Sequence, residues 1–423
     1  MNQEIVESVQ HAITPAECQD LYYAGKTNTE AQCFPTTMEN RFYVALNATS
    51  FGSSSQITFN PDQGVSDIVL NLQLPVAAGG VDYADWALAR GWGYNAIRQI
   101  GFRIGGSSLY YITGDQMAVD ALDACEDQEK KDAILALGGS ECLTAADFTD
   151  QAKLSAYVYI KLPWNSPSSL QKPLPLPSDL LTQPVQIIVE FNPASSIFVP
   201  LAGASAAALP AGFSYAQANF RQVHLADSGH LLARRVNMNE NALTYPLRGF
   251  LQTAFKTTIA ATAGQPVQVN LTGFRQGSVK DITLWAVKAS DLASGQGLLY
   301  APLLDVRLSV NGLIYFQSVA ESSQMWALID RKTPAVVTTT SLADAGGGVA
   351  TATPYSAGWT IVPFAQVGEP LAGENEVVLG LPIQNSVVNL QVTFPESATY
   401  VLVASYKYVS SLMFSRGSAE YVF

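Results

Sequence analysis

Charged residues are scarce in this chain of 423 residues. They make up 14% of it, against about 25% in an average soluble protein. The charge that is present is mostly acidic, with a formal net charge of −12 and no cluster of Lys and Arg. A protein that binds DNA or RNA through phosphates needs a basic patch. We therefore expect no direct, sequence-specific nucleic-acid binding.

Long apolar runs are missing as well. No window of about 18 uninterrupted apolar residues occurs, so no membrane-spanning helix is expected. The first residues, MNQEIVESVQHAITPAE, contain no basic stretch followed by an apolar core. We therefore expect no secretory signal.

Cysteine is rare, and its spacing fits no metal template. The chain has Cys18, Cys33, Cys125 and Cys142, none of them in a CxxC pair. This spacing matches no known zinc pattern. We expect four free thiols in a reducing compartment; the alternative is a disulfide between Cys125 and Cys142, which flank one short helical segment.

The residues that usually carry catalysis are few. The histidines are His11, His224 and His230, and a metal pair of His224 and His230 would need a further ligand. No Gly-x-Ser-x-Gly motif is present. The acidic cluster from Asp120 to Asp132 lacks the pattern of a calcium loop, so we expect a solvated helix face. We predict no catalytic residue, no metal site and no cofactor.

Strand patterns dominate what is present. Apolar and polar residues alternate with period two in many short segments, which is typical of strands in β-sandwiches. These segments are 57–59, 66–74, 157–160, 185–191, 267–271, 281–287, 388–394 and 400–404. The chain also has 31 Gly and 22 Pro, which suits many turns. The fold class is predicted to be all-β.

Helices and long loops are expected in a few places. Residues 114–137 have the best helical pattern, and shorter helices are predicted at 1–12 and 227–235. Residues 162–184 are rich in Pro, and residues 335–358 are rich in Thr, Ala and Gly. We expect both of these segments to be long loops.

The chain repeats itself weakly at about half its length. Asp67-Ile68 resembles Asp281-Ile282, Arg103 with its flanks resembles Arg307, and the strand ending at Phe191 resembles the one ending at Phe394. The matches occur in the same order. We therefore predict two copies of one eight-stranded sandwich, with these pairs overlaid; two unrelated β-domains are the alternative.

This repeat predicts a division of the chain into four parts. They are an N-terminal arm at 1–25, a first sandwich at 26–226, a connecting helix at 227–236 and a second sandwich at 237–423.

Each copy also contains a hairpin signal at its middle match. Gly105 and Gly106 lie between two strand patterns in the first copy, and Asn311 and Gly312 do so in the second. Tight hairpins require positive φ angles, which Gly and Asn adopt readily. We predict structural turns at these four residues and no phosphate-binding role, because no strand–GxGxxG–helix unit surrounds them.

Three segments resemble one known family. The first is 92–106, WGYNAIRQIGFRIGG, with Gly114-Asp115 after it; the second is 160–164 with the Pro-rich stretch and the strand ending at Phe191; the third is 220–227 with Arg234-Arg235. In their order, these segments resemble the double jelly-roll major capsid proteins of nucleocytoplasmic large DNA viruses, virophages, polinton-like viruses and tailless phages.

The resemblance implies a fold and a function. It implies two tandem eight-stranded jelly rolls with a few short helices, in a homotrimer that tiles an icosahedral shell with neighbouring capsomers. Implied partners are minor capsid or penton proteins, and an internal membrane or inner-layer proteins through the N-terminal arm. The implied location is the virion capsid, after synthesis in the host cytoplasm. The alternative is a secreted or surface carbohydrate-binding sandwich, lectin-like or a glycosidase.

Overall fold

The structure, a computed structural model, describes most of the chain. The described residues are 36–59, 64–77, 83–104, 107–125, 127–160, 183–201, 204, 209–225, 245–275, 277–319, 336–346, 348–364, 380–415 and 418–422. Strands dominate them, and the predicted all-β class with two eight-stranded jelly rolls and a few short helices is confirmed.

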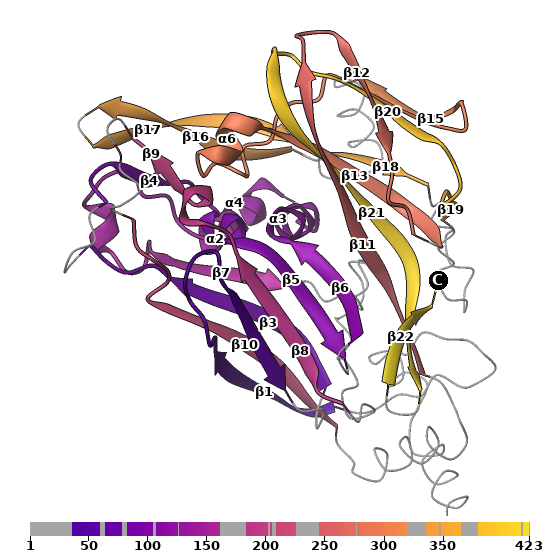
Figure 1. Cartoon of the computed structure of the whole chain (residues 1–423). Coiled ribbons are helices and arrows are strands. Elements are labelled where there is room, and N and C mark those ends of the chain that lie inside the picture. The colour runs from indigo at the N-terminus through magenta and orange to yellow at the C-terminus, as the bar shows by residue number, and fades with distance from the viewer. Residues whose placement is uncertain are drawn as a thin grey trace, which may run out of the picture.

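The first sandwich consists of two four-stranded antiparallel sheets (Figure 1). One has the order β1 (Thr36–Ala45), β10 (Tyr215–Leu225), β3 (Gly64–Gln73) and β7 (Ser155–Ile160). The other has the order β2 (Ser54–Phe59), β8 (Val185–Phe191), β5 (Ile97–Ile104) and β6 (Ser107–Thr113). In β8 every second residue is buried, because alternate side chains of a strand point to opposite faces.

The second sandwich repeats this arrangement (Figure 1). Its sheets have the orders β11 (Tyr245–Ala261), β21 (Ala398–Ser415), β13 (Ser278–Lys288), β18 (Thr360–Pro363), and β12 (Pro266–Leu271), β20 (Val388–Thr393), β14 (Asp305–Val310), β15 (Leu313–Val319). Two short strands, β19 (Leu381–Pro382) and β22 (Ser418–Val422), pair with β13 and β21. Strands taken in chain order occupy the same places in the sheets of both copies.

The strand registers of the two copies also agree. Asp67 on β3 pairs with Arg221 on β10, and Asp281 on β13 pairs with Lys407 on β21. In both ladders the register shifts just before the aspartate, so that both copies have a bulge at the same place. Ile68 and Ile282, the next residues, are both buried. Asp67-Ile68 and Asp281-Ile282 thus occupy equivalent places, as the repeat predicts.

The predicted overlay of Arg103 with Arg307 is wrong by two residues. The ladder between β5 and β6 shifts after Phe102, and the ladder between β14 and β15 shifts after Leu308, each close to the hairpin turn. Matching these shifts places Arg103 with Ser309. A shift of two residues keeps each side chain on the same face, so alternation in the sequence does not reveal it.

The same register supports the overlay of Phe191 with Phe394. Gln186 on β8 lies opposite Arg103, and Asn389 on β20 lies opposite Ser309. Phe191 and Phe394 follow these two residues at the same interval. Both phenylalanines are buried in the core.

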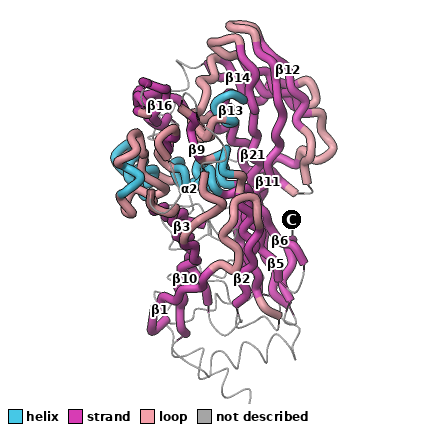
Figure 2. The backbone as a smooth tube through the Cα atoms, turned by 60° about the vertical axis from the view of Figure 1, so that its left-hand side comes forward, coloured by secondary structure: helices cyan, strands magenta, loops and turns pink. Residues whose placement is uncertain are grey.

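Helices are few, and they gather where the two sandwiches meet (Figure 2). The helical segment expected at 114–137 is two helices, α3 (Gly114–Asp123) and α4 (Gln128–Leu137), and Asp127 caps the second by accepting from the backbone N–H of Lys130. The shorter elements are α2 (Trp92–Ala96), η2 (Asp147–Thr149), η4 (Ala194–Ser196) and α6 (Ala289–Ala293). The predicted helices at 1–12 and 227–235 lie outside the described residues. Among those described, no helix has the length and apolar character that crossing a membrane requires.

The expected loop at 335–358 is instead a hairpin of two strands, β16 (Val336–Gly346) and β17 (Val349–Gly358). Its β-branched Val and Thr residues favour extended backbone, and Gly346 and Gly348 supply the positive φ of the turn. The hairpin reaches across to the first sandwich (Figure 1), where the N–H of Ala350 donates to the carbonyl of Leu143. Nearly all of the other expected loop, 162–184, lies outside the described residues.

The hairpin rests on a small ribbon of the first sandwich, β4 (Trp86–Leu88) paired with β9 (Phe198–Pro200). A separate apolar cluster joins Ala87 and Val199 of the ribbon to Leu342 and Ala350 of the hairpin. The second sandwich therefore holds the first through a strand hairpin as well as through its main sheet.

Candidate functional site at the junction of the sandwiches

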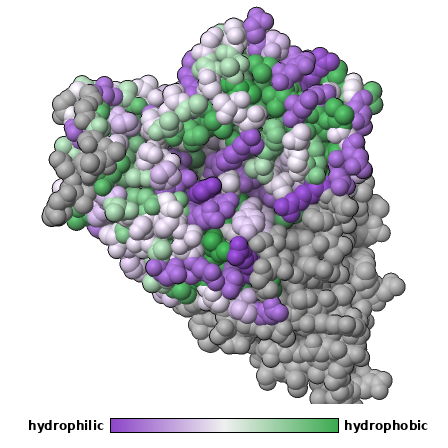
Figure 3. Space-filling model, viewed as in Figure 1, coloured by the Kyte–Doolittle hydropathy of each residue, from purple (hydrophilic) through white to green (hydrophobic). Residues whose placement is uncertain are grey.

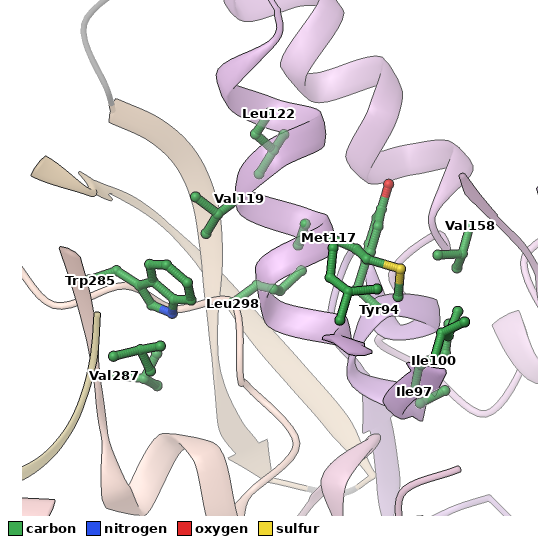
Figure 4. Close-up of a cluster of buried hydrophobic side chains, with 14 of the residues drawn as sticks. Tyr94, Ile97, Ile100, Met117, Val119, Leu122, Val158, Trp285, Val287 and Leu298 are labelled. Carbon is green, nitrogen blue, oxygen red and sulfur yellow. The ribbon is translucent and has the colours of Figure 1, made fainter. Parts of the chain in front are cut away.

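The helix α3 joins the two sandwiches. It follows β6 of the first sandwich and lies on the outer face of the β11-β21-β13-β18 sheet of the second (Figure 1). Val119 of α3 faces Trp285 of β13 (Figure 4). Residues 281–287 of β13 are all buried, because one face of the strand meets its own core and the other meets the first sandwich.

The start of α3 is set by local chemistry. Thr113 and Gln116 form a capping box, in which the N–H of Thr113 donates to Oε1 of Gln116. Gly114 has no space for a side chain, because a Cβ there would lie 2.1 Å from the carbonyl oxygen of Tyr94 and 2.4 Å from that of Ile97. Gly114, noted in the sequence together with Asp115, is thus required for the close packing at the start of this helix.

A buried ionic cluster lies under α3. Nζ of Lys407 lies 3.5 Å from Oδ1 of Asp120 and 3.7 Å from Oδ1 of Asp281. The amide of Gln252 also donates to Oδ1 of Asp120, at 3.0 Å. Burial alone would lower the pKa of Lys407, but Asp281 and Asp120 outweigh it and raise that pKa above its usual value. The lysine is therefore held as a cation inside the junction.

Other polar contacts cross the junction around this cluster. They are Gln116 Nε2 to Ser405 Oγ at 3.0 Å, Tyr110 OH to Gln252 Oε1 at 3.1 Å, Lys256 Nζ to Asp115 Oδ2 at 2.8 Å, Trp359 Nε1 to Asp123 Oδ1 at 3.0 Å, Asn95 Nδ2 to the carbonyl of Gly295 at 3.3 Å, and Lys131 Nζ to the carbonyl of Val336 at 3.0 Å. Directional bonds of this kind set the relative orientation of two packed surfaces.

The prediction of a solvated acidic helix face at 120–132 is wrong for Asp120. Asp120 is buried in the junction, because α3 packs against another sheet. Asp127, which caps α4, and Glu129 in its first turn are exposed, as expected. Among the described residues, no group of His, Cys, Asp and Glu is arranged to hold a metal ion.

Two of the four predicted turn residues are described, and they lie in the hairpin of the second jelly roll. Asn311 and Gly312 lie between β14 and β15 with φ angles of 51° and 83°. Oδ1 of Asn311 accepts from the backbone N–H of Val387 at 2.9 Å. Gly105 and Gly106 lie outside the described residues, between the paired ends of β5 and β6.

The histidines and cysteines are only partly described. His224 lies in β10, opposite Met38, while His11 and His230 lie outside the described residues. Cys125 and Cys142 are buried and are not joined by a disulfide, so the alternative of a bridge between them is wrong. Cys18 and Cys33 lie outside the described residues.

Comparison with known proteins connects this geometry to a fold. No family model and no curated protein matches the sequence. PBCV-1 VP54, a crystal structure fitted into a reconstruction of the virophage Sputnik, superposes with a TM-score of 0.62 at 13% identity, covering 94% of this chain and 100% of that one. The chain has the double jelly-roll fold of viral major capsid proteins.

Two further structures extend the likeness. The Faustovirus major capsid protein has a TM-score of 0.58 at 11% identity, covering 98% of each chain. A chain of the Sputnik virophage, solved by cryo-EM, has a TM-score of 0.54 at 10% identity, covering 97% of this chain and 92% of that one. The likeness spans both jelly rolls and the junction between them.

Proposed function

We propose that this chain is a structural major capsid protein that forms homotrimers, and that these pseudo-hexagonal blocks tile an icosahedral virus shell. The observation that carries the proposal is the joining of two jelly rolls of the same strand order through a buried junction. Such a chain presents two similar jelly rolls in one fixed relative orientation. Three chains then present six jelly rolls, a number that suits hexagonal packing.

The composition supports an assembling protein. Charged residues are depleted at the cores of protein interfaces, and this chain has few of them. We expect each contact between copies to bury more than the roughly 800 Å² per partner of a standard interface. The chemistry of the protein would then lie in its interfaces, with no catalytic role.

The proposal includes the domain boundaries and partners expected from the sequence. Residues 1–25 would be an arm toward an inner membrane or inner-layer proteins, 26–226 and 237–423 the two jelly rolls, and 227–236 the connector. Minor capsid or penton proteins would bind the assembled trimers, in virions whose capsid protein is made in the host cytoplasm.

Light scattering and negative-stain imaging of the purified full chain test the proposal. We expect a trimer mass and hexagonal outlines. A stable monomer at micromolar concentration would contradict it. A glycan-binding screen provides the second arm, since saturable binding by such a monomer would favour the carbohydrate-binding alternative.

A further inference from the structure

The outer faces of the two equivalent sheets differ in what covers them. In the second jelly roll, α3 buries the outer face of β11-β21-β13-β18. No described helix covers the equivalent face of the first jelly roll, on β1-β10-β3-β7, and this face, called the tyrosine face below, carries exposed tyrosines. These are Tyr43, Tyr157, Tyr159 and Tyr215, of which Tyr43 is 62% exposed. Tyrosine is enriched at protein interfaces.

The duplicated ion pair shows the same difference. Asp67 and Arg221 hold the ladder positions that Asp281 and Lys407 hold in the second copy. The Arg221 side chain is 41% exposed, whereas the Lys407 side chain is 9% exposed. The tyrosine face of the first jelly roll thus has the register and charge pattern of a face that is buried elsewhere in the same chain.

A second surface with exposed apolar residues lies on the other jelly roll. Within the chain, β6 lies against β11, and Tyr110 of β6 bonds Gln252 of β11 across the junction. Its equivalent, β15, is an edge strand with successive exposed apolar residues, Leu313, Ile314 and Tyr315. Apolar side chains also show on the surface over this sheet (Figure 3).

These two surfaces are equivalent in position to the two halves of the contact that joins the jelly rolls within the chain. β6 and α3 of the first jelly roll meet β11-β21-β13 of the second. We infer that the β15 side of one copy's second jelly roll binds the tyrosine face of a second copy's first jelly roll, with β15 beside β1. This inference rests on the proposed function and names the surfaces that would build the trimer.

The contact is head-to-tail, because it joins different surfaces of the two partners. Such contacts generate a ring when the rotation closes. An edge strand with an apolar surface is otherwise a liability for uncontrolled pairing, and burial against a specific partner removes that liability.

Two substitutions that introduce a charge test the inference, one on each surface. Tyr43→Arg and Ile314→Arg should each weaken association by about 30-fold or more and give monomers, since each buries an unpaired cation in the contact. The matched control is Leu137→Arg, at an exposed site at the end of α4, which should assemble as the wild type does. Circular dichroism and thermal unfolding check that all three variants are folded.

Mixing the two monomeric variants tests the head-to-tail arrangement. Tyr43→Arg keeps β15 intact, and Ile314→Arg keeps the tyrosine face intact, so the mixture should form a one-to-one heterodimer through a single contact. Native mass spectrometry should be run well above the wild-type association concentration, because ring closure no longer contributes. A mixture that stays monomeric, or either variant pairing with itself, overturns the inference.

The outcome for the wild type separates this inference from the proposed function. A monomeric wild type would defeat the proposed function and the inference together. A trimeric wild type whose two variants also form normal trimers would defeat only the assignment of these surfaces.

Discussion

Lys407 on β21 lies directly opposite Asp281 on β13, with its Nζ 3.7 Å from Oδ1 of the aspartate. The first jelly roll has the same pairing between Arg221 and Asp67, at 3.3 Å. The two pairs share a strand register and a bulge, but they differ in burial: the Arg221 side chain is 41% exposed, whereas the Lys407 side chain, which Asp120 of α3 contacts, is 9% exposed. Duplication has thus placed one pair in two environments, so that the effect of burial can be measured within one protein.

Lys407→Met should strongly destabilise the protein. It removes the cation between Asp120 and Asp281, which are both buried, and breaking a buried ion pair from one side costs about 3–5 kcal/mol. Chemical denaturation, followed by fluorescence, gives the change in the free energy of unfolding.

The control for this change is Arg221→Met in the first jelly roll. Its side chain is partly exposed, so water can solvate Asp67, and the expected cost is about 1 kcal/mol or less. Both changes should be made in the Ile314→Arg background, which we expect to be monomeric, so that association between copies makes no contribution. Equal costs at the two sites would contradict the role of α3 as a cover.

Gly114→Ala should destabilise the junction by about 2–4 kcal/mol, because backbone carbonyls occupy the space that a Cβ needs. Gly312→Ala is the matched comparison, since a Cβ there meets nothing within 4 Å but the φ is +83°. Its expected cost is about 1 kcal/mol, from backbone strain alone. Thermal unfolding of both variants measures the two losses of stability. A smaller loss of stability for Gly114→Ala than for Gly312→Ala would contradict the role given to Gly114.

The fold could be predicted from the sequence because the strands of a sandwich leave a local signal in it. Period-two alternation in segments such as 185–191 and 388–394 identifies strands, and the order of the repeats identifies duplication. The hairpin at 336–358 was missed because its Thr and Ala residues blur the alternation. The run of Val and Thr at 336–340 was the signal that could have found it.

The contacts at the junction could not be predicted from the sequence in the same way. Asp120 and Lys407 are far apart in the chain, and nothing near either residue indicates its partner. The helical pattern around Asp120 shows an amphipathic segment, but an acidic residue at the edge of such a pattern normally faces water. Only the placement of α3 on a second sheet explains why this carboxylate is buried.

Cys125 and Cys142 should resist thiol reagents in the folded protein. Burial raises the pKa of Cys125, and burial followed by the nearby Asp147 raises the pKa of Cys142 to about 12. The reactive thiolate is therefore almost absent at pH 8 for Cys142, and it is less populated than in an exposed cysteine for Cys125. Peptide mapping after alkylation should find both residues unmodified in the native protein and modified after unfolding. Rapid native labelling, or a linked Cys125–Cys142 peptide, would contradict the prediction.

Asp147 should make the stability of the hairpin contact depend on pH. Although burial raises the pKa of this carboxyl, hydrogen bonds from Lys153 and from the N–H groups of Leu143 and Thr144 lower it to about 2. Leu143 in turn accepts from Ala350 of the β16–β17 hairpin. The carboxylate therefore holds the segment on which the second jelly roll's hairpin rests.

The direction of the pH effect follows from this lowered pKa. An aspartate whose pKa is lower in the folded state stabilises the fold above its unfolded value of about 3.9, and the contribution is lost as the pH falls toward 2. Asp147→Asn should lower the free energy of unfolding by about 1–2 kcal/mol at pH 7, since Lys153 stays partly solvated. The difference from the wild type should shrink between pH 4 and about 2. The exposed Glu129→Gln is the control, and hydrogen exchange at Ala350 should quicken only in Asp147→Asn. A pH-independent difference would show that the Asp147 carboxylate does not act through its charge.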